Sequence, residues 1–431
     1  MSIKRQMLLV GALMFICSSL AHAQLKIQAE IRPRTEYRHG FKTLMNKDAD
    51  PAFFTEQRSR LYFSYKQSKL QLQLNVQDVR IWGNANTVYK SDPALTNVHE
   101  AWAAIYLNPL WSIKAGRQEI NYDNSRFMSH LAWQQQSISH DALLVRYENQ
   151  EKKWKAHLGG AFNQNIPFEP AQLSGSFYSG VNNYKTMQYV WANKTWDKGQ
   201  LSLLLQNDGR QRPDSTVAFR QTLGSFFQYN GKKTGLGAEV YYQTGKNAGG
   251  LDVNAYLVSL NLRWTAGKSQ FTIGSDYLSG TAADEATDRS FAPLYGLNHA
   301  FYGYMDYFYA GNFHGQNGKI TGLWDNYLKM VFNHTERTNI TLFLHGFQSP
   351  VDILDTTNEK ASAYLGTEVD VVYQHKFLEG IALLDVGYSQ MFGTESLELI
   401  KGGDSSAFNN WIWMMLTIKP VLFDSAKLTE K

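Results

Sequence analysis

The residues with the clearest chemistry are a set of arginines between positions 32 and 146. A guanidinium is always charged in proteins and can bind a carboxylate through two parallel hydrogen bonds, so arginines that line a passage favour anions. The set predicted to line such a passage is Arg32, Arg34, Arg58, Arg60, Arg80, Arg117, Arg126 and Arg146. Their predicted acidic partners are Glu30, Glu36, Asp78, Glu100, Glu119 and Asp141. Each arginine therefore has two alternative roles, attraction of anions or bracing of a wall by cross-strand ion pairs.

Catalysis is the competing chemistry, and its nearest candidates are Ser139, His140 and Asp141, which are consecutive. Neighbours in a strand point to opposite faces, so His140 cannot easily meet both others in one site. The eleven histidines show no metal-type spacing. Acidic residues in the segment 284–288 could hold Ca²⁺, but solvated loop charges are the simpler interpretation. The sequence predicts no enzyme, no metal site and no cofactor.

The segment AEIRPRTEYR (29–38) shows which element must carry the first arginines. Charged residues occupy every second position, and Ile31, Thr35 and Tyr37 fill positions between them. Side chains alternate between the two faces of a strand, so one face is charged and the other mostly apolar. The charged face would be the outside of a soluble sandwich or the lumen of a membrane barrel. Pro33 lacks a backbone donor, which predicts a bulge or a missing ladder bond there.

The same period of two recurs along the chain. KLQLQLNVQ (69–77) alternates leucine with amides, and similar alternation appears at 154–163, 256–264, 340–345 and 365–374. Runs of roughly ten residues have the length that a tilted strand needs to cross a bilayer.

Short and long connections take turns between these runs. The short links are 66–69, 108–109, 149–153, 230–233, 266–268 and 335–339, and the long ones are 39–54, 82–97, 121–138, 163–185, 279–319, 348–361 and 393–409. Short periplasmic turns and long extracellular loops are typical of outer-membrane barrels. The sequence therefore predicts an all-β, antiparallel up-and-down transmembrane barrel of about 18 strands, with its charged strand faces toward the lumen.

The first residues predict export. Residues 1–23 contain Lys4 and Arg5, an apolar run from Met7 to Ile16 and an Ala-His-Ala cleavage site, as a signal peptide does. Nothing divides the remainder, 24–431, which is predicted to be one barrel domain in the outer membrane of a Gram-negative cell. A net charge of +4 offers no basic footprint for nucleic acid. The 14% aromatic content suits aromatic girdles at the two membrane interfaces.

Several segments together resemble the alginate-export porin family. They are RPRTEYR (32–38), QDVRIWGN (77–84), AGRQEINYDNSRF (115–127), SISHDALLVRY (137–147), FYGYMDYFYAGN (301–312), YLGTEVDVVYQH (364–375) and a final strand NNWIWMMLTIKP (409–420). The resemblance implies an eighteen-stranded outer-membrane barrel with an arginine-rich pore for anionic polysaccharide or small anions. Matching to these motifs favours Arg32, Arg34, Arg80, Arg117 and Arg126, and alternation alone adds Arg58, Arg60 and Arg146.

The expected function is passive passage of anionic solutes or of an alginate-like polysaccharide. Expected partners are that solute, outer-membrane lipid and the barrel assembly machinery, and the expected state is a monomer. The alternatives are an adhesin or a closed ligand-binding barrel, because the segment 279–319 could fold into the lumen or stand outside it. An outer-membrane hydrolase is a weaker alternative.

Overall fold

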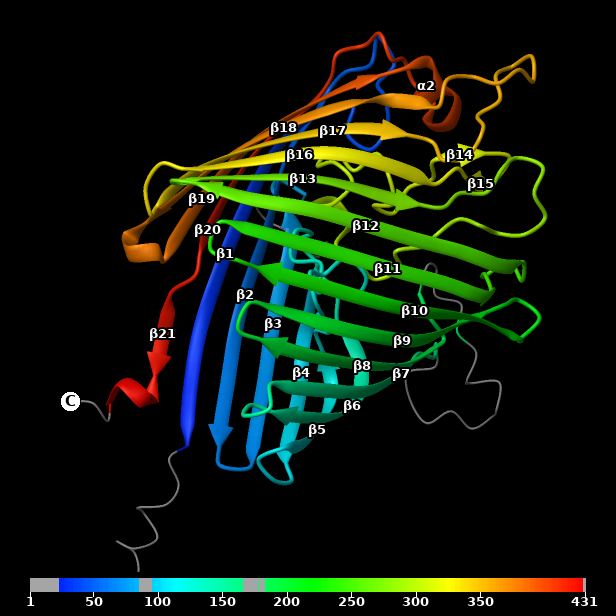
Figure 1. Ribbon diagram of the computed structural model, residues 1–431. Coiled ribbons are helices and arrows are strands. Elements are labelled where there is room, and N and C mark those ends of the chain that lie inside the picture. The colour runs from blue at the N-terminus through cyan, green and yellow to red at the C-terminus, as the bar shows by residue number, and fades with distance from the viewer. Residues whose placement is uncertain (1–22, 85–94, 166–177, 179–182, 429–431) are drawn as a thin grey trace, which may run out of the picture.

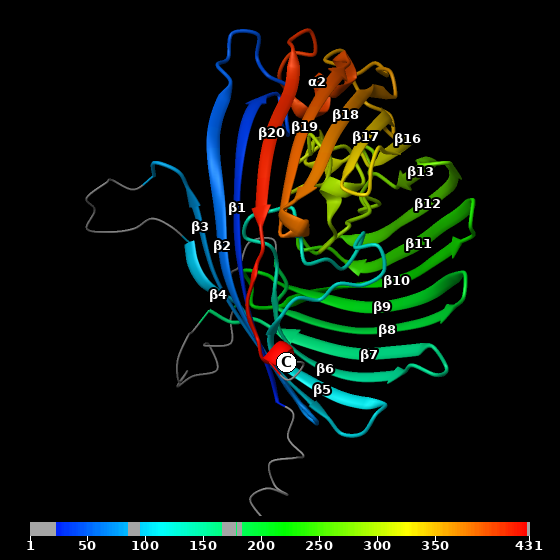
Figure 2. The ribbon, with the colours of Figure 1, turned by 90° about the vertical axis from the view of Figure 1, so that its left-hand side faces the viewer.

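The computed structural model describes residues 23–84, 95–165, 178 and 183–428. Long antiparallel strands pair in sequence order around a closed barrel, in which β1 lies between β2 and β20 (Figures 1 and 2). The first strands are β1 (Gln24–His39), β2 (Ala52–Gln67), β3 (Leu70–Ile81), β4 (Leu95–Tyr106), β5 (Trp111–Gln118), β6 (His140–Asn149), β7 (Trp154–Phe162), β8 (Thr186–Trp196) and β9 (Gly199–Gln211).

The second half of the wall continues the same antiparallel pairing. Its strands are β10 (Val217–Asn230), β11 (Thr234–Lys246), β12 (Asp252–Ala266), β13 (Ser269–Leu278), β16 (Leu323–Asn333), β17 (Thr338–Gln348), β18 (Tyr364–Phe377), β19 (Ala382–Gly393), β20 (Asn409–Ile418) and β21 (Val421–Asp424). The connections contain β14 (Gly315–Gln316), β15 (Lys319–Ile320), α2 (Glu395–Lys401) and the 3-10 turns η2 (Asn298–Ala300), η3 (Leu378–Gly380) and η4 (Ser425–Leu428). No helix among the described residues is long and apolar enough to cross a membrane.

Strands β20 and β21 are two segments of one barrel strand. Lys419 and Pro420 separate them, and both segments pair with β1. The barrel therefore has 18 strands, which confirms the predicted architecture. The pairing of β1 with β20 passes from Ile31 to Arg34 without a shift of register and skips Pro33. The ladder is therefore interrupted at Pro33, as expected, and no bulge forms there.

The two faces of each strand differ as the alternation predicted. Leu72 and Leu74 of β3 are each 40% exposed, whereas Asn75 and Gln77, which follow at the alternate positions of the same strand, are 2% and 3% exposed. Large apolar side chains are exposed on the outer face of most strands, where a bilayer covers them. The polar face points into the lumen and is nevertheless buried, so something other than water must cover it.

Two long loops provide that cover by folding into the lumen. The loop 119–139 follows β5, and the loop 279–322 follows β13. They meet through Ser129 N–H, which donates to Tyr295 O at 3.0 Å, and Leu297 N–H, which donates to Ser125 O at 2.9 Å. The segment 279–319, whose course the sequence left open, thus folds inward.

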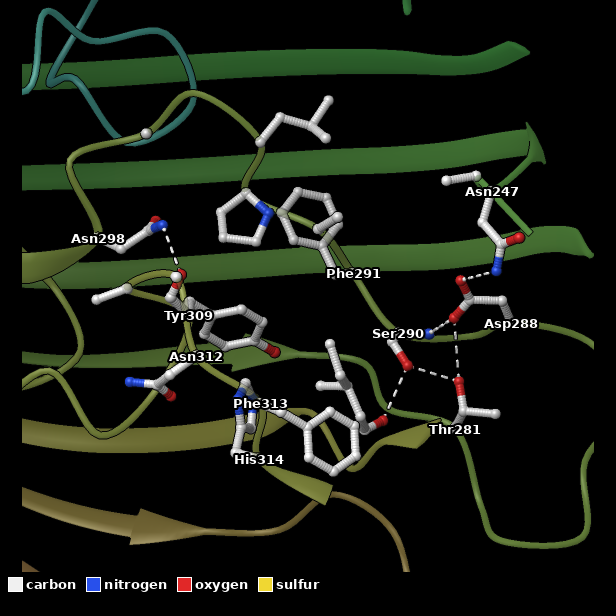
Figure 3. Close-up of a pocket in the computed structure, with 18 of the residues that line it drawn as sticks. Asn247, Thr281, Asp288, Ser290, Phe291, Asn298, Tyr309, Asn312, Phe313 and His314 are labelled. Carbon is white, nitrogen blue, oxygen red and sulfur yellow. Dashed lines mark hydrogen bonds between the residues drawn. The ribbon is translucent and has the colours of Figure 1, made fainter. Parts of the chain in front are cut away.

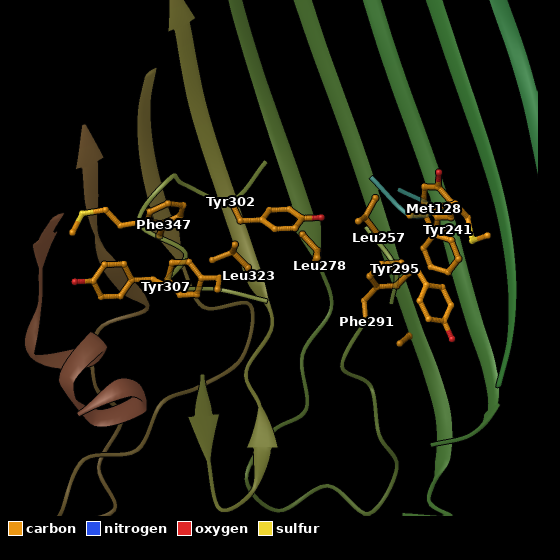
Figure 4. Close-up of a cluster of buried hydrophobic side chains, with 14 of the residues drawn as sticks. Met128, Tyr241, Leu257, Leu278, Phe291, Tyr295, Tyr302, Tyr307, Leu323 and Phe347 are labelled. Carbon is orange, nitrogen blue, oxygen red and sulfur yellow. The ribbon is translucent and has the colours of Figure 1, made fainter. Parts of the chain in front are cut away.

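Aromatic side chains of these loops pack with side chains of the wall in a buried apolar cluster inside the barrel (Figure 4). Tyr302 and Tyr307 are fully buried in the loop 279–322, and Leu278, Leu323 and Phe347 of the wall are fully buried around them. Burial of apolar surface is the main favourable term in folding, so the loops are a packed part of the fold.

Candidate channel constriction

Arginines of β1 and β2 hold the loop 119–139 against one side of the lumen. The Arg32 guanidinium donates to Ala132 O at 2.7 Å and to Gln135 Oε1 at 2.9 Å. Arg34 donates to Trp133 O at 2.8 Å, and its guanidinium lies 4.4 Å from the centre of the Trp133 ring. Arg32 and Arg34 are 6% and 4% exposed, and Gln135 is 1% exposed. Carbonyl groups of the loop thereby gain charged donors, which make stronger hydrogen bonds than neutral ones.

The same wall carries acidic partners, as the bracing alternative predicted. Arg58 Nη2 lies 2.5 Å from Glu30 Oε1, and Arg34 Nε lies 2.7 Å from Glu36 Oε1. Glu36 also accepts from Arg38, which the sequence reasoning left out of the site, at 2.8 Å. These arginines brace the wall and the loop at the same time.

Arg60 of β2, Glu100 of β4 and Glu119 at the start of the loop 119–139 lie on the lumen side of the wall. Arg60 donates to Gln77 Oε1 at 2.9 Å and lies 3.9 Å from Glu119. Glu119 in turn lies 2.8 Å from His99 Nε2. Glu100 is bound by neutral groups, since the Trp102 indole N–H donates to it at 3.0 Å and the Asn75 amide donates as well.

Arg126 fastens the other side of the loop 119–139 to the far wall. Its guanidinium lies 2.9 Å from Glu239 of β11 and 2.6 Å from Asp276 of β13, and it donates to Ser259 Oγ of β12 at 3.1 Å. The ring of Phe301 lies 4.0 Å from the guanidinium carbon. The two carboxylates raise the pKa of Arg126 against the opposing effect of its burial. This arginine is a buried tether across the lumen.

Arg146 and Lys114 also face the lumen, but they contact neutral groups and not carboxylates. Arg146 Nε donates to Ser112 Oγ at 3.1 Å, and the Lys114 ammonium lies 4.0 Å from the centre of the Trp102 ring. Within the described part of the chain, neither has an acidic partner within 4.0 Å. Sequence reasoning missed Lys114, although its strand parity with the buried Ser112 places it on the lumen face.

Arg80 and Asp78 do not line the lumen, which corrects the prediction. Gln77 and Val79 are the buried lumen residues of β3, at 3% and 6% exposure, so the residues that alternate with them point outward. Arg80 Nε lies 2.6 Å from Asp78 on that outer face. Motif matching selected Arg80, whereas counting positions from Leu72 would have placed it outside.

Arg117 and Asp141 are a second outer pair, and the same correction applies. Gln118 of β5 is fully buried on the lumen side, so the preceding residue Arg117 points outward. Arg117 and Asp141 form a two-point ion pair at 3.0 and 2.9 Å, with side chains 44% and 53% exposed. Exposed pairs of this kind stabilise a fold by only about 0–1 kcal/mol.

The sequence reasoning also missed an acidic stretch of the wall, which runs from β11 to β18. Its acidic residues are fully or almost fully buried. They are Glu239, Asp276, Asp325, Glu368 and Asp370. Each lies at a lumen-facing parity of its strand, but they are scattered over the second half of the chain and form no local motif. Among the described residues, no group of three or more His, Cys, Asp or Glu side chains could hold a metal ion. The constriction is thus basic on one side, acidic on the other and filled between by two loops.

A closed 18-strand barrel with an apolar outer face and a charged, loop-constricted lumen is an outer-membrane channel of the porin class. The model of the alginate export family matches residues 23–397. The chain belongs to that family, which confirms the resemblance of its motifs. The protein is a channel and not an enzyme.

Solved porin structures share the fold at low sequence identity. OpdK of Pseudomonas aeruginosa, solved with vanillate, is 10% identical with a TM-score of 0.61, over 92% of this chain and 98% of that one. A BenF-like porin from Pseudomonas fluorescens Pf-5 is also 10% identical, with a TM-score of 0.62 over 92% and 99%. OccAB2 of Acinetobacter baumannii is 10% identical, with a TM-score of 0.60 over 93% and 98%. No curated protein matches the sequence.

Proposed function

We propose that this channel passes anionic solutes, including acidic polysaccharide such as alginate, by passive diffusion. The observation that carries the proposal is the pair Lys114 and Arg146, two lumen-facing cations that form no ion pair within 4.0 Å among the residues the structure describes. Glu100 and Glu119 act on Lys114, and Glu148 acts on Arg146, only over longer distances. Fixed like charges over a low-dielectric wall set which ions enter a pore. The braced arginines Arg32, Arg34 and Arg58 position the loop and add to the positive potential of this wall.

Further cations support the same preference at the short-turn end of the barrel. These cations are Lys26, Lys155, Arg263 and Lys376. Each lies on the same strand face as buried lumen residues. The lumen face at this end also carries acidic residues, Glu148 of β6 and Asp385 of β19, so the cations there are in excess but not alone. An excess of one sign of charge at a mouth raises the local concentration of the opposite ion. Anions would therefore gather at this end before they meet the constriction.

The test is the reversal potential of the reconstituted channel under a salt gradient. The wild type should prefer anions, most strongly at low salt, where the Debye length is roughly 30 Å at 0.01 M. The double variant Lys114→Glu/Arg146→Glu should shift the reversal potential toward cation preference. The matched control Arg80→Glu/Arg117→Glu makes the same change of charge on the outer face and should leave selectivity unchanged. Cation preference of the wild type would refute the proposal.

A closed ligand-binding barrel is the second candidate, and the inward loops favour it. The same bilayer recording separates the two, because a closed barrel gives no single-channel conductance while still migrating as a folded barrel on unheated gels. Passage of solutes requires discrete conductance steps.

We further propose the route by which the chain reaches the membrane. The signal peptide 1–23 lies almost wholly outside the described residues; cleavage before Gln24 would leave β1 as the first element of a single barrel domain, 24–431. In β21, Phe423 pairs with Ile27 and offers an aromatic side chain on the outer face of the last strand for the assembly machinery. Mass spectrometry of the purified protein should find Gln24 at its N-terminus, and light scattering in detergent should find a monomer.

A further inference from the structure

A groove of about 580 Å³ lies on the outer face of the barrel, across the strands from β12 to β18. The outward-facing residues at one level of this wall are neighbours from strand to strand. In order they are Leu260, Ser275, Asn326, Gly346 and Thr367. Gly346 has no side chain and the residues beside it are small or of medium size, so the wall is hollow at this level.

Larger side chains border the groove above and below. Trp324 lies one outward position closer to the long loops, and its indole N–H donates to Ser275 Oγ at 2.9 Å. On the other side, one outward position closer to the short turns, lie Ile273, Leu328 and Leu344. The groove therefore runs across the strands, with an aromatic border on one side and an aliphatic border on the other.

Two sets of aromatic rings on β12, β13 and β16 mark the level of the groove in the membrane. Near the long loops, the ring centre of Tyr277 lies 5.7 Å from that of Tyr256 and 6.3 Å from that of Trp324. Near the short turns, the rings are Trp264, Phe271 and Phe332. Aromatic girdles of this kind lie at the two membrane interfaces, and long loops are extracellular. The groove is therefore inside the apolar band, next to the girdle of the outer leaflet.

Asn326 brings an unsatisfied polar group into this groove. It is exposed on β16, and its amide makes no hydrogen bond to any residue that the structure describes. The hydroxyl groups beside it have partners, since Ser275 accepts from Trp324 and Thr367 is bonded to Tyr364 at 2.5 Å. Asn326 follows Trp324 by two residues, so it lies roughly 7 Å along the strand from the girdle toward the membrane centre. An unpaired polar group in hydrocarbon is costly, so the amide needs a partner from whatever fills the groove.

The cavity inside the long-loop mouth of the barrel differs in this respect. It measures about 730 Å³ and is lined in part by Asp288. This carboxylate accepts from Asn247, Thr281 and the Ser290 N–H at 2.9, 3.2 and 3.0 Å (Figure 3). The polar groups there satisfy one another, whereas the amide of Asn326 on the outer face depends on a molecule from outside the chain.

A lipid chain suits this groove better than a second barrel does. The groove is continuous with the apolar outer face that the bilayer already covers. In a two-fold dimer through this face, the same patch of both copies meets itself, so one hollow would face the other and stay unfilled. A flexible acyl chain can fill the hollow, and the carbonyl of its ester can accept from the Asn326 amide.

We propose that this groove binds an acyl chain of lipid A, the outer-leaflet lipid of a Gram-negative outer membrane. The chain lies over Gly346 between Trp324 and Leu328, and its ester carbonyl accepts a hydrogen bond from the Asn326 amide. The groove is on the opposite face of the wall from the lumen, so the proposal does not depend on the anion preference proposed above.

Native mass spectrometry of the purified, delipidated protein with added hexa-acylated lipid A tests the proposal. The wild type should bind one lipid A saturably, and Gly346→Leu should weaken this binding about tenfold because its side chain occupies the groove. A Cβ at Gly346 meets only Asn326 O, at 3.7 Å, so the substitution fits the fold. The matched control is Gly160→Leu on the outer face of β7, where a Cβ meets only Met187 O at 4.0 Å. This control should bind lipid A as the wild type does.

Asn326→Leu separates a specific site from general contact with lipid. The substitution makes the outer face more apolar, so non-specific contact would become stronger, whereas loss of the hydrogen bond should weaken binding about three- to tenfold. Unchanged or stronger binding in Asn326→Leu would overturn the proposal. Equal binding by Gly346→Leu and Gly160→Leu, or binding of phosphatidylethanolamine but not of lipid A, would overturn it as well.

Two further measurements distinguish this site from a subunit interface and from the pore. Light scattering that finds a wild-type dimer and a monomeric Gly346→Leu would assign the groove to a second copy and refute the lipid site. The reversal potential of Gly346→Leu should equal that of the wild type, so failure of the lipid site and failure of the anion preference are separate results. The heat-dependent gel shift checks that each variant folds, and if Gly346→Leu does not, Asn326→Leu still decides.

Discussion

Replacing Arg126 with glutamine tests whether a buried tether holds the loop 119–139 across the lumen. Arg126 and its two partners, Glu239 and Asp276, have side chains no more than 2% exposed, at distances of 2.9 and 2.6 Å. Breaking a buried ion pair costs about 3–5 kcal/mol, because the remaining charge is left uncompensated. Here two carboxylates lose their cation, so we expect the upper part of this range.

The matched control is Arg117→Gln, the same substitution at an exposed outer pair. Arg117 and Asp141 are 44% and 53% exposed, and a pair of this kind contributes about 0–1 kcal/mol. Denaturant titration in lipid vesicles, followed by the heat-dependent gel shift, measures both variants. Equal losses of unfolding free energy in the two would refute the reasoning about burial.

Two further measurements separate loss of the tether from loss of the barrel. The triple variant Arg126→Gln/Glu239→Gln/Asp276→Asn removes all three charges and should recover most of the lost stability, since the penalty arises from the unpaired carboxylates. In planar bilayers, Arg126→Gln should show larger or noisier conductance because the loop loses its far anchor. A stable but electrically unchanged variant would mean that the remaining contacts of the loop are sufficient.

Two other predictions concern the membrane face and the effect of pH. Leu72→Arg should lower the free energy of unfolding by roughly 2–4 kcal/mol in a refolding titration if the residue lies near the bilayer midplane. Gln73→Arg, on the lumen face, should lower it far less. Similar losses in the two variants would show that the faces are assigned wrongly. Burial and the nearby Lys42 lower the pKa of Lys401 from 10.5 to about 8. The unfolded chain therefore binds more protons between these values, so stability should rise with pH across this range, and Lys401→Gln should flatten the rise in the denaturant midpoint.

The alternation of single strands was sufficient to predict the wall. Leu72 and Gln73 point to opposite faces in the structure as their order in the sequence predicts, because side-chain direction in a strand follows from the backbone alone. The same rule would have placed Arg80 and Arg117 outside. Their assignment to the lumen was wrong because it rested on motif matching and disregarded parity.

The sequence by itself thus determined the strands, their two faces, the alternation of short and long connections and the family. Only the tertiary structure decided what fills the lumen. Arg126 meets Asp276 across 150 positions of sequence, and Arg32 meets Gln135 across 103. Loops have no periodicity from which the direction of a side chain could be read. The partners of a loop residue therefore become defined only when the closed barrel brings distant strands around it.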